Sequence, residues 1–110
     1  MKTVSPLGRL RKRVTLEQPV ETPDAIGGVT RSFAALATLW AEIAPLSGAE
    51  TFAAVQPQER ITHRVRLRYF SAVTAAMRLR LGTRLLLIRD VSDEDERRRY
   101  LICHCTEDKP

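Results

Sequence analysis

The chain has 110 residues, of which 44% are hydrophobic, 28% are charged and 5% are aromatic. This length and composition predict one folded domain with a single modest core, and they exclude a disordered chain. Lys and Arg number 18 against 13 Asp and Glu, for a formal net charge of +5, and nearly all of these cations are Arg. Because Arg suits multidentate contacts with phosphates or carboxylates, the charge indicates either an anionic partner or simply a solubilising surface.

The N-terminal segment and the longest apolar run bear on where the protein is found. Residues 1–12 read as a polar, basic arm without an apolar stretch, so we expect no secretory signal. The strongest apolar run, residues 85–88, is far too short to cross a bilayer. We therefore expect a protein that is made and kept in a cytoplasm and has no membrane partner.

Alternation of apolar and polar side chains predicts the first two strands. Residues 14–18 alternate in this way and indicate a first strand. Residues 19–28, which contain two prolines and the pair Gly27-Gly28, are typical of a turn region. A second strand is expected over 29–36, and it continues or resumes over 38–43.

A short helix is expected after Pro45, which ends this alternation. Ser47-Gly48-Ala49-Glu50 fits a capping box, in which the Ser47 side chain accepts from the Glu50 amide and the Glu50 side chain accepts from the Ser47 amide. The helix would cover residues 48–56, with Phe52 and Val55 among its few apolar contacts. A helix of about nine residues is not stable alone in water, so it must dock on its own domain or on a neighbour.

The clearest strand of the chain is expected over residues 60–69. One face would carry Ile61, His63, Val65, Leu67 and Tyr69, and the other Arg60, Thr62, Arg64, Arg66 and Arg68. Like charges stacked along one strand face repel one another, so an acidic partner should lie near this Arg ladder. That partner could be an acidic strand of the same domain, a neighbouring subunit or a phosphate backbone.

The C-terminal half completes a mainly β fold. Residues 77–81 repeat the alternation, with Arg78 and Arg80 on the polar side, up to a turn at 82–83. A buried strand over 84–91, an acidic turn over 92–96, a partner strand over 97–106 and a tail over 107–110 follow. Six or seven short antiparallel strands with one short α-helix in a long loop predict a small β-barrel over residues 1–110. The expected core is Val14, Leu16, Trp40, Ile43, Val65, Leu67, Leu86, Ile88, Leu101 and Cys103.

Candidate catalytic and metal-binding residues are few. On a strand, Cys103 and Cys105 share one face and His104 points to the other, so the three cannot converge on one ion. His63 falls on an apolar face, where a core histidine is the default. No glycine-rich phosphate loop follows a strand, and the carboxylates at 93–96 fit a solvated turn. We therefore expect no enzyme, no metal site and no cofactor.

Several segments together resemble a known family. They are LGRLRKRVTL (7–16), PDAIGGV (23–29), LWAEI (39–43), PLSGAETFAA (45–54), THRVRLRY (62–69) and MRL (77–79). In this order and spacing they resemble the head-tail joining proteins, also called head-closure or stopper proteins, of tailed bacteriophages and gene transfer agents. The chain departs from the family at Phe33, where Trp is frequent, and at 85–88, where an aromatic residue is common. Both departures fit substitutions within a core.

The resemblance implies a small β-barrel whose copies form a hexameric or dodecameric ring in the virion, after assembly in the bacterial host cytoplasm. The ring would lie below the portal and adaptor, above a tail terminator or tail tube protein, and around double-stranded DNA. Residues 45–60 would face the channel and help to retain DNA until ejection. The channel residues would be Ser47, Gly48, Glu50, Phe52, Val55 and Gln56. Contacts with DNA or with a neighbouring subunit would come from Arg64, Arg66, Arg68, Arg78 and Arg80.

Two other interpretations remain open. One is a tail-terminator ring, which would lie further down the same particle. The other is a monomeric OB-like nucleic-acid-binding module that uses the Arg ladder. The scarcity of aromatic residues argues against recognition of single strands by base stacking, whereas contact with the phosphates of duplex DNA remains possible. In the ring interpretation, the acidic turn at 93–96 and the Arg ladder would suit a heterologous contact between neighbours.

Overall fold

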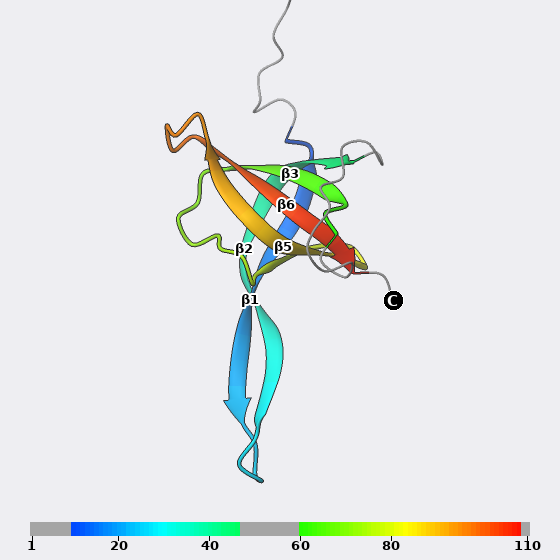
Figure 1. Ribbon diagram of the computed structural model, residues 1–110, viewed down its shortest axis with the longest axis vertical. Coiled ribbons are helices and arrows are strands. Elements are labelled where there is room, and N and C mark those ends of the chain that lie inside the picture. The colour runs from blue at the N-terminus through cyan, green and yellow to red at the C-terminus, as the bar shows by residue number, and fades with distance from the viewer. Residues whose placement is uncertain (1–9, 47–59, 109–110) are drawn as a thin grey trace, which may run out of the picture.

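The described chain is a closed antiparallel β-barrel (Figure 1). The computed structural model describes residues 10–46 and 60–108. Their strands are β1 (Lys12–Pro23), β2 (Val29–Pro45), β3 (His63–Arg68), β4 (Arg78–Leu81), β5 (Arg84–Glu94) and β6 (Tyr100–Asp108), and they close in the order β1-β2-β3-β6-β5-β4. The prediction of a small, mainly β barrel is confirmed. The helix expected over 48–56 lies outside the described residues, and the described part of the chain holds no helix suited to span a membrane.

The barrel interior is filled by the apolar side of each strand, as period-two alternation requires. The buried cluster is Val14, Leu16, Ala41, Val65, Leu67, Val73, Leu79, Leu86, Ile88, Leu101, Cys103 and Cys105. Eight of the ten expected core residues belong to it, and Ile43 packs against it partly buried. The core is therefore aliphatic, with two thiols in place of larger side chains.

Trp40 was wrongly expected in the core. Its side chain is 49% exposed, whereas the next residue, Ala41, is fully buried opposite Leu67. Alternation along β2 consequently sends Trp40 to the outer surface together with Glu42. There the guanidinium of Arg13 lies 4.8 Å from the centre of the indole ring, in cation–π contact.

Residues 18–35 of β1, its turn and β2 leave the barrel as a projecting hairpin (Figure 1). Among the strands of 10–46 and 60–108, β1 pairs beyond Glu17 with β2 alone, because β4 pairs with β1 only from Thr15 to Glu17. Leu16 pairs with Ala37 and Glu17 with Ala35, so Leu36 forms a β-bulge where the hairpin begins. The hairpin makes the molecule elongated, with extents of 61 × 29 × 27 Å.

The projecting hairpin corrects the expected turn over 19–28. Pro19 does not end the strand, because β1 is an edge strand at this point and proline is tolerated on such an edge. The turn is confined to residues 24–28, where Oδ1 of Asp24 accepts from the amides of Ile26 (3.0 Å) and Gly28 (2.8 Å). Gly27 has a φ of +84°, which favours glycine. This bonding fixes a tight tip on which Ile26 is 91% exposed.

Several other boundaries differ from those expected. β5 continues through Glu94 and β6 through Asp108, so the acidic turn and the C-terminal tail both begin later than predicted. β3 covers His63–Arg68, a shorter segment than 60–69. At the other end, Leu10 is buried and Lys12 already lies in β1, so the fold begins before the end of the arm expected over 1–12.

Candidate assembly site

The Arg ladder lies on the outer face of β3, as the alternation predicted. Val65 and Leu67 are fully buried, while Arg64, Arg66 and Arg68 point outward. The strand is central to the sheet here, with β2 on one side and β6 on the other. What these charges can do therefore depends on the carboxylates of the neighbouring strands.

Arg66 is held between two carboxylates of its own chain. Its Nη1 donates to Glu42 of β2 at 2.6 Å, and its Nε and Nη2 donate to the two oxygens of Glu94 of β5 at 3.0 and 2.6 Å. The hydrogen bonds and charge of Glu94, followed by those of Glu42, raise the pKa of Arg66 against the effect of burial. The acidic partner expected for the ladder is, at this position, part of the same domain.

Arg64 and Arg68 differ from Arg66 in their surroundings. Both are exposed, and neither forms an ion pair with any residue in 10–46 or 60–108. Arg68 lies at the end of β3, beside Trp40. On β3, these two residues are therefore the members of the ladder whose charge is available to an outside partner.

Arg78 and Arg80 of β4 bind one buried carboxylate at the base of the projecting hairpin. Nε of Arg78 donates to Oε1 of Glu17, and Nε of Arg80 donates to Oε2 at 2.8 Å. Arg78 also lies 3.9 Å from the centre of the Phe33 ring. Burial raises the pKa of Glu17, but the hydrogen bonds and charges of the two arginines outweigh it and leave that pKa below its usual range. These residues join β1 to β4, the pair of strands that closes the barrel, and we call Glu17, Arg78 and Arg80 the seam clamp.

The two ends of segment 47–59 are fixed to the barrel side by side. The Leu46 amide donates to the Thr62 carbonyl at 2.9 Å, and the Thr62 amide donates to the Cys105 carbonyl at 2.9 Å. The Thr62 hydroxyl accepts from the Glu107 amide at 2.8 Å. Segment 47–59 thus leaves and rejoins the barrel at one anchored point. The expected channel residues, Ser47, Gly48, Glu50, Phe52, Val55 and Gln56, lie outside the described residues.

The thiols and the last histidine are arranged as the alternation predicted. Cys103 and Cys105 are fully buried inside the barrel, and burial, with a smaller effect of the Asp90 charge, raises the pKa of Cys103 to about 12. His104 lies on the outside, with Nδ1 3.3 Å from Oδ2 of Asp90. Within 10–46 and 60–108, no group of three His, Cys, Asp or Glu could hold a metal ion.

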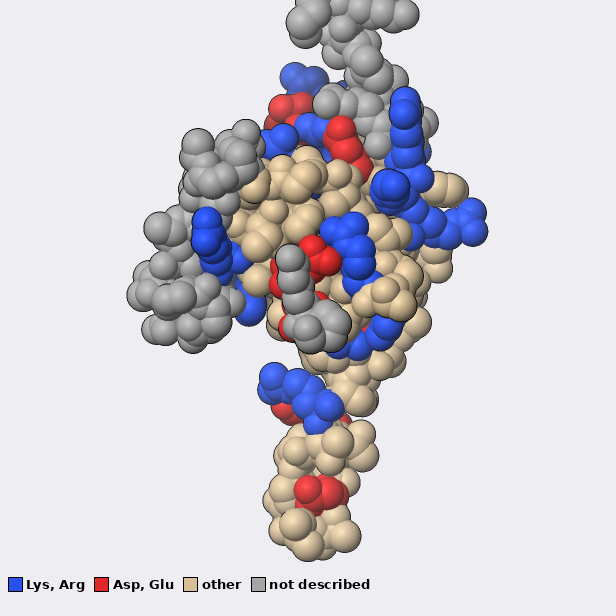
Figure 2. Space-filling view, turned by 90° about the vertical axis from the view of Figure 1, so that its right-hand side faces the viewer, with Lys and Arg blue, Asp and Glu red and all other residues tan. Residues whose placement is uncertain are grey.

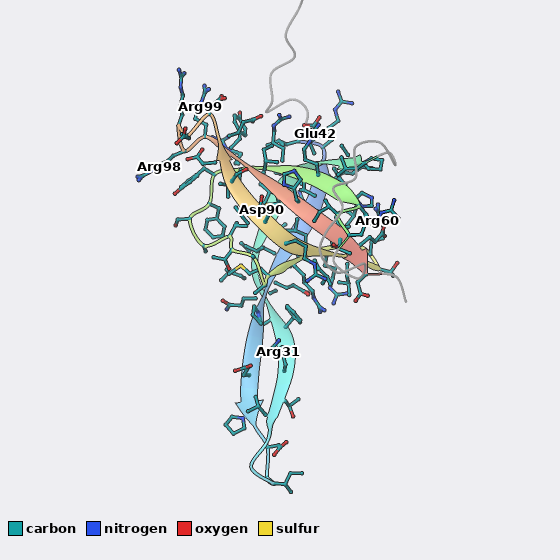
Figure 3. All side chains as sticks on the ribbon, viewed as in Figure 1. Arg31, Glu42, Arg60, Asp90, Arg98 and Arg99 are labelled. Carbon is teal, nitrogen blue, oxygen red and sulfur yellow. The ribbon has the colours of Figure 1, made fainter. Side chains whose placement is uncertain are left out.

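An apolar groove beside Trp40 was not foreseen. Its volume is about 490 Å³, and it is lined by Leu10, Thr38, Leu39, Trp40 and Arg68; we call it the Trp40 groove. The alternation of Trp40 with Ala41 could have indicated an outward indole. The hydrogen bonds of Glu17 with Arg78 and Arg80 could not be predicted from any local pattern, because these residues are 61 and 63 positions apart in the sequence. Figure 3 shows Glu42 on the barrel and Arg31 out on the projecting hairpin.

Three comparisons relate the chain to other proteins. A family model described as "Phage head completion protein" matches residues 6–108. A chain in the virion of a native gene transfer agent particle has 23% identity and a TM-score of 0.66, covering 88% of this chain and 93% of that one. The solution structure of protein SF1141 from Shigella flexneri 2a has 27% identity and a TM-score of 0.69, covering 94% and 96%. No curated protein matches the chain.

Replacing Glu17 with Gln tests the seam clamp. The substitution removes one charge shared by two arginines, and we expect it to lower the free energy of unfolding by about 1–3 kcal/mol near neutral pH. Because the pKa of Glu17 is lowered in the folded state, this difference is present above the unfolded pKa, about 4.3, and shrinks as the pH falls through the folded pKa. Urea unfolding across this pH range measures it.

Glu21→Gln is the matched control for this experiment. Glu21 also pairs with an arginine, Arg31 at 2.9 Å, but the two side chains are 58% and 67% exposed. Loss of such a surface pair should cost less than about 1 kcal/mol. Equal losses for the two variants, or a loss at Glu17 that does not change with pH, would contradict the seam clamp.

Proposed function

Because the chain belongs to the phage head completion protein family, we propose that it closes the filled head of a phage-like particle and joins it to the tail. The family match over residues 6–108 is the observation that carries this proposal. It also confirms the resemblance inferred from the sequence. The role is that of a structural virion component and requires no catalytic residue.

We further propose that copies of the chain form a ring around the DNA channel, between the portal or adaptor and the tail. A projecting hairpin and a separate barrel surface on one subunit suit a heterologous contact, in which two different faces pair repeatedly until a ring closes.

Segment 47–59 is proposed to face this channel and to help retain DNA. The support is its anchored base: the backbone bonds of Leu46, Thr62 and Cys105 fix both ends of the segment to the barrel. In this proposal the segment acts on DNA while the barrel, and with it the ring, stays unchanged. Retention and release of DNA would then not require the subunits to separate.

The rival interpretation as a monomeric nucleic-acid-binding module is weakened by the charge pairing. Arg66, Arg78 and Arg80 each donate to carboxylates of their own chain, so three of the five arginines expected to contact DNA or a neighbour already have an acidic partner. A phosphate would have to displace these carboxylates at a cost in free energy. We therefore expect passing DNA to be held weakly and through few phosphates.

Particles produced without this chain test the joining role. We expect DNA-filled heads to lose their genome and tails to accumulate unattached, because the joint between them is missing. Electron microscopy counts the joined particles, and nuclease treatment measures exposed DNA. Resupplying the intact chain should restore both. A normal yield of DNA-filled, tailed particles in its absence would contradict the proposed function.

A shortened variant separates DNA retention from joining. Because Leu46 and Thr62 are hydrogen-bonded neighbours, residues 47–59 can be replaced by Asn-Gly to leave a four-residue hairpin loop on an intact barrel. We expect the thermal unfolding temperature to change little and heads and tails to remain joined, but the particles to lose their DNA to nuclease. Full protection of DNA in the shortened variant would remove the retention role and leave the joining role standing.

A further inference from the structure

The tip of the projecting hairpin presents an apolar side chain on a rigid support. Ile26 is 91% exposed and Val29 is 61% exposed. Single exposed apolar residues are common on proteins and need no explanation of their own. Ile26 differs because the bonds of Asp24 to the Ile26 and Gly28 amides fix the turn that carries it, far out from the barrel. It is therefore presented with little conformational freedom left to lose on binding.

The Trp40 groove is a second incomplete apolar surface, and at about 490 Å³ it has room for the apolar side chain and the neighbouring residues of a hairpin tip. Trp40 is 49% exposed on the barrel wall, and Leu10 and Leu39 line the groove beside it. An exposed indole beside a concave apolar surface is typical of the centre of a protein interface. Within the described residues, nothing fills this groove.

The hairpin of a subunit cannot fill its own groove. Trp40 and Val29 lie on the same continuous strand, β2, and at roughly 3.3 Å per residue about 36 Å of strand separates them. The base of the hairpin is held by the seam clamp, so the ribbon does not fold back. Any filling of the groove by Ile26 must therefore come from a second copy of the chain.

The charges of the two surfaces are complementary. On the projecting hairpin, Arg31 is paired with Glu21, and the tip carries the exposed carboxylate of Asp24. At the groove, Arg68 lines the wall and Arg13 covers one side of the indole. In Figure 2 the hairpin is mostly uncharged, while Lys and Arg gather over the barrel. A hairpin tip with a carboxylate fits a groove edged by arginines better than it fits another hairpin.

We propose that Ile26 at the hairpin tip of one copy inserts into the Trp40 groove of the next copy, with Asp24 facing Arg68. The contact is heterologous, since each copy gives a tip and receives one, and repetition around an axis closes a ring. The inference rests on the proposed ring and names the contact that holds neighbouring subunits together. It also gives the exposed Arg68 an acidic partner on a neighbouring subunit.

Cysteine cross-linking in assembled particles tests this contact. In Ile26→Cys/Thr38→Cys, one new thiol is at the tip and the other on the exposed rim of the groove. Oxidation should join copies into a ladder of covalent oligomers on non-reducing gels. The native Cys103 and Cys105 are fully buried, so the unmodified chain should stay monomeric on the gel. Ile26→Cys/Ser92→Cys, with the second thiol on the outer face of β5, is the matched control and should give no ladder.

The possible outcomes separate the two proposals. Incorporation of the Ile26→Cys/Thr38→Cys chain without a ladder, or a ladder of equal strength in the Ser92 control, would overturn the contact and leave the joining role intact. Absence of the unmodified chain from purified particles would overturn both.

A pair of variants that each introduce one positive charge provides an independent test that does not depend on thiol chemistry. Ile26→Lys places a cation against Arg68 and Arg13 of the next copy, and we expect the amount of the chain in particles to fall at least about tenfold. Ala25→Lys adds the same charge one residue away on the same exposed turn, and incorporation should stay near normal. Equal incorporation of the two variants would overturn the proposed contact.

Discussion

Closure of the barrel through the short strand β4 is the constraint on which the rest of the molecule depends. β4 has four residues and pairs with β1 over only three, Thr15–Glu17. At that seam, Glu17 is almost fully buried and receives a hydrogen bond from each of two arginines. A buried carboxylate without such partners would be unfavourable, so Glu17 is stable here only because β4 brings Arg78 and Arg80 beside β1. The hydrogen bonds of the seam clamp in turn hold β4 against β1. Without it, β1 and β4 would be two free sheet edges.

The shortness of β4 also explains why the molecule has a projecting hairpin. β1 and β2 remain paired with each other well beyond Glu17, where β4 no longer pairs with β1. The ribbon therefore leaves the barrel, with Phe33 near its base still in contact with Arg78, and ends in a tight turn. Elsewhere on the barrel, the backbone of Thr62 anchors the end of segment 47–59 to β6. Arg60, next to this anchor, lies on the barrel in Figure 3, well away from Arg31 on the hairpin. The barrel thus carries two separate elements, for which we propose roles in subunit contact and in DNA retention.

Much of this fold could be predicted from alternation. Val65 and Leu67 were expected inside and the arginines that alternate with them outside, because successive side chains of a strand point to opposite faces. The prediction failed where a residue type was given more weight than the pattern. Pro19 was interpreted as the end of a strand although an edge strand tolerates it. Trp40 was placed in the core together with Ile43, although alternation puts the two on opposite faces of their strand. The partners of the arginines could not be predicted, because Glu17 and Glu94 come into reach only through the order of strands around the barrel.

Electron cryomicroscopy of intact particles tests the central claim, that this barrel forms a ring at the joint between head and tail. We predict a closed ring of density at that joint that accommodates one barrel per subunit, with each projecting hairpin touching the wall of the next barrel. Location of the chain at the far end of the tail, or its absence from joined particles, would contradict the account.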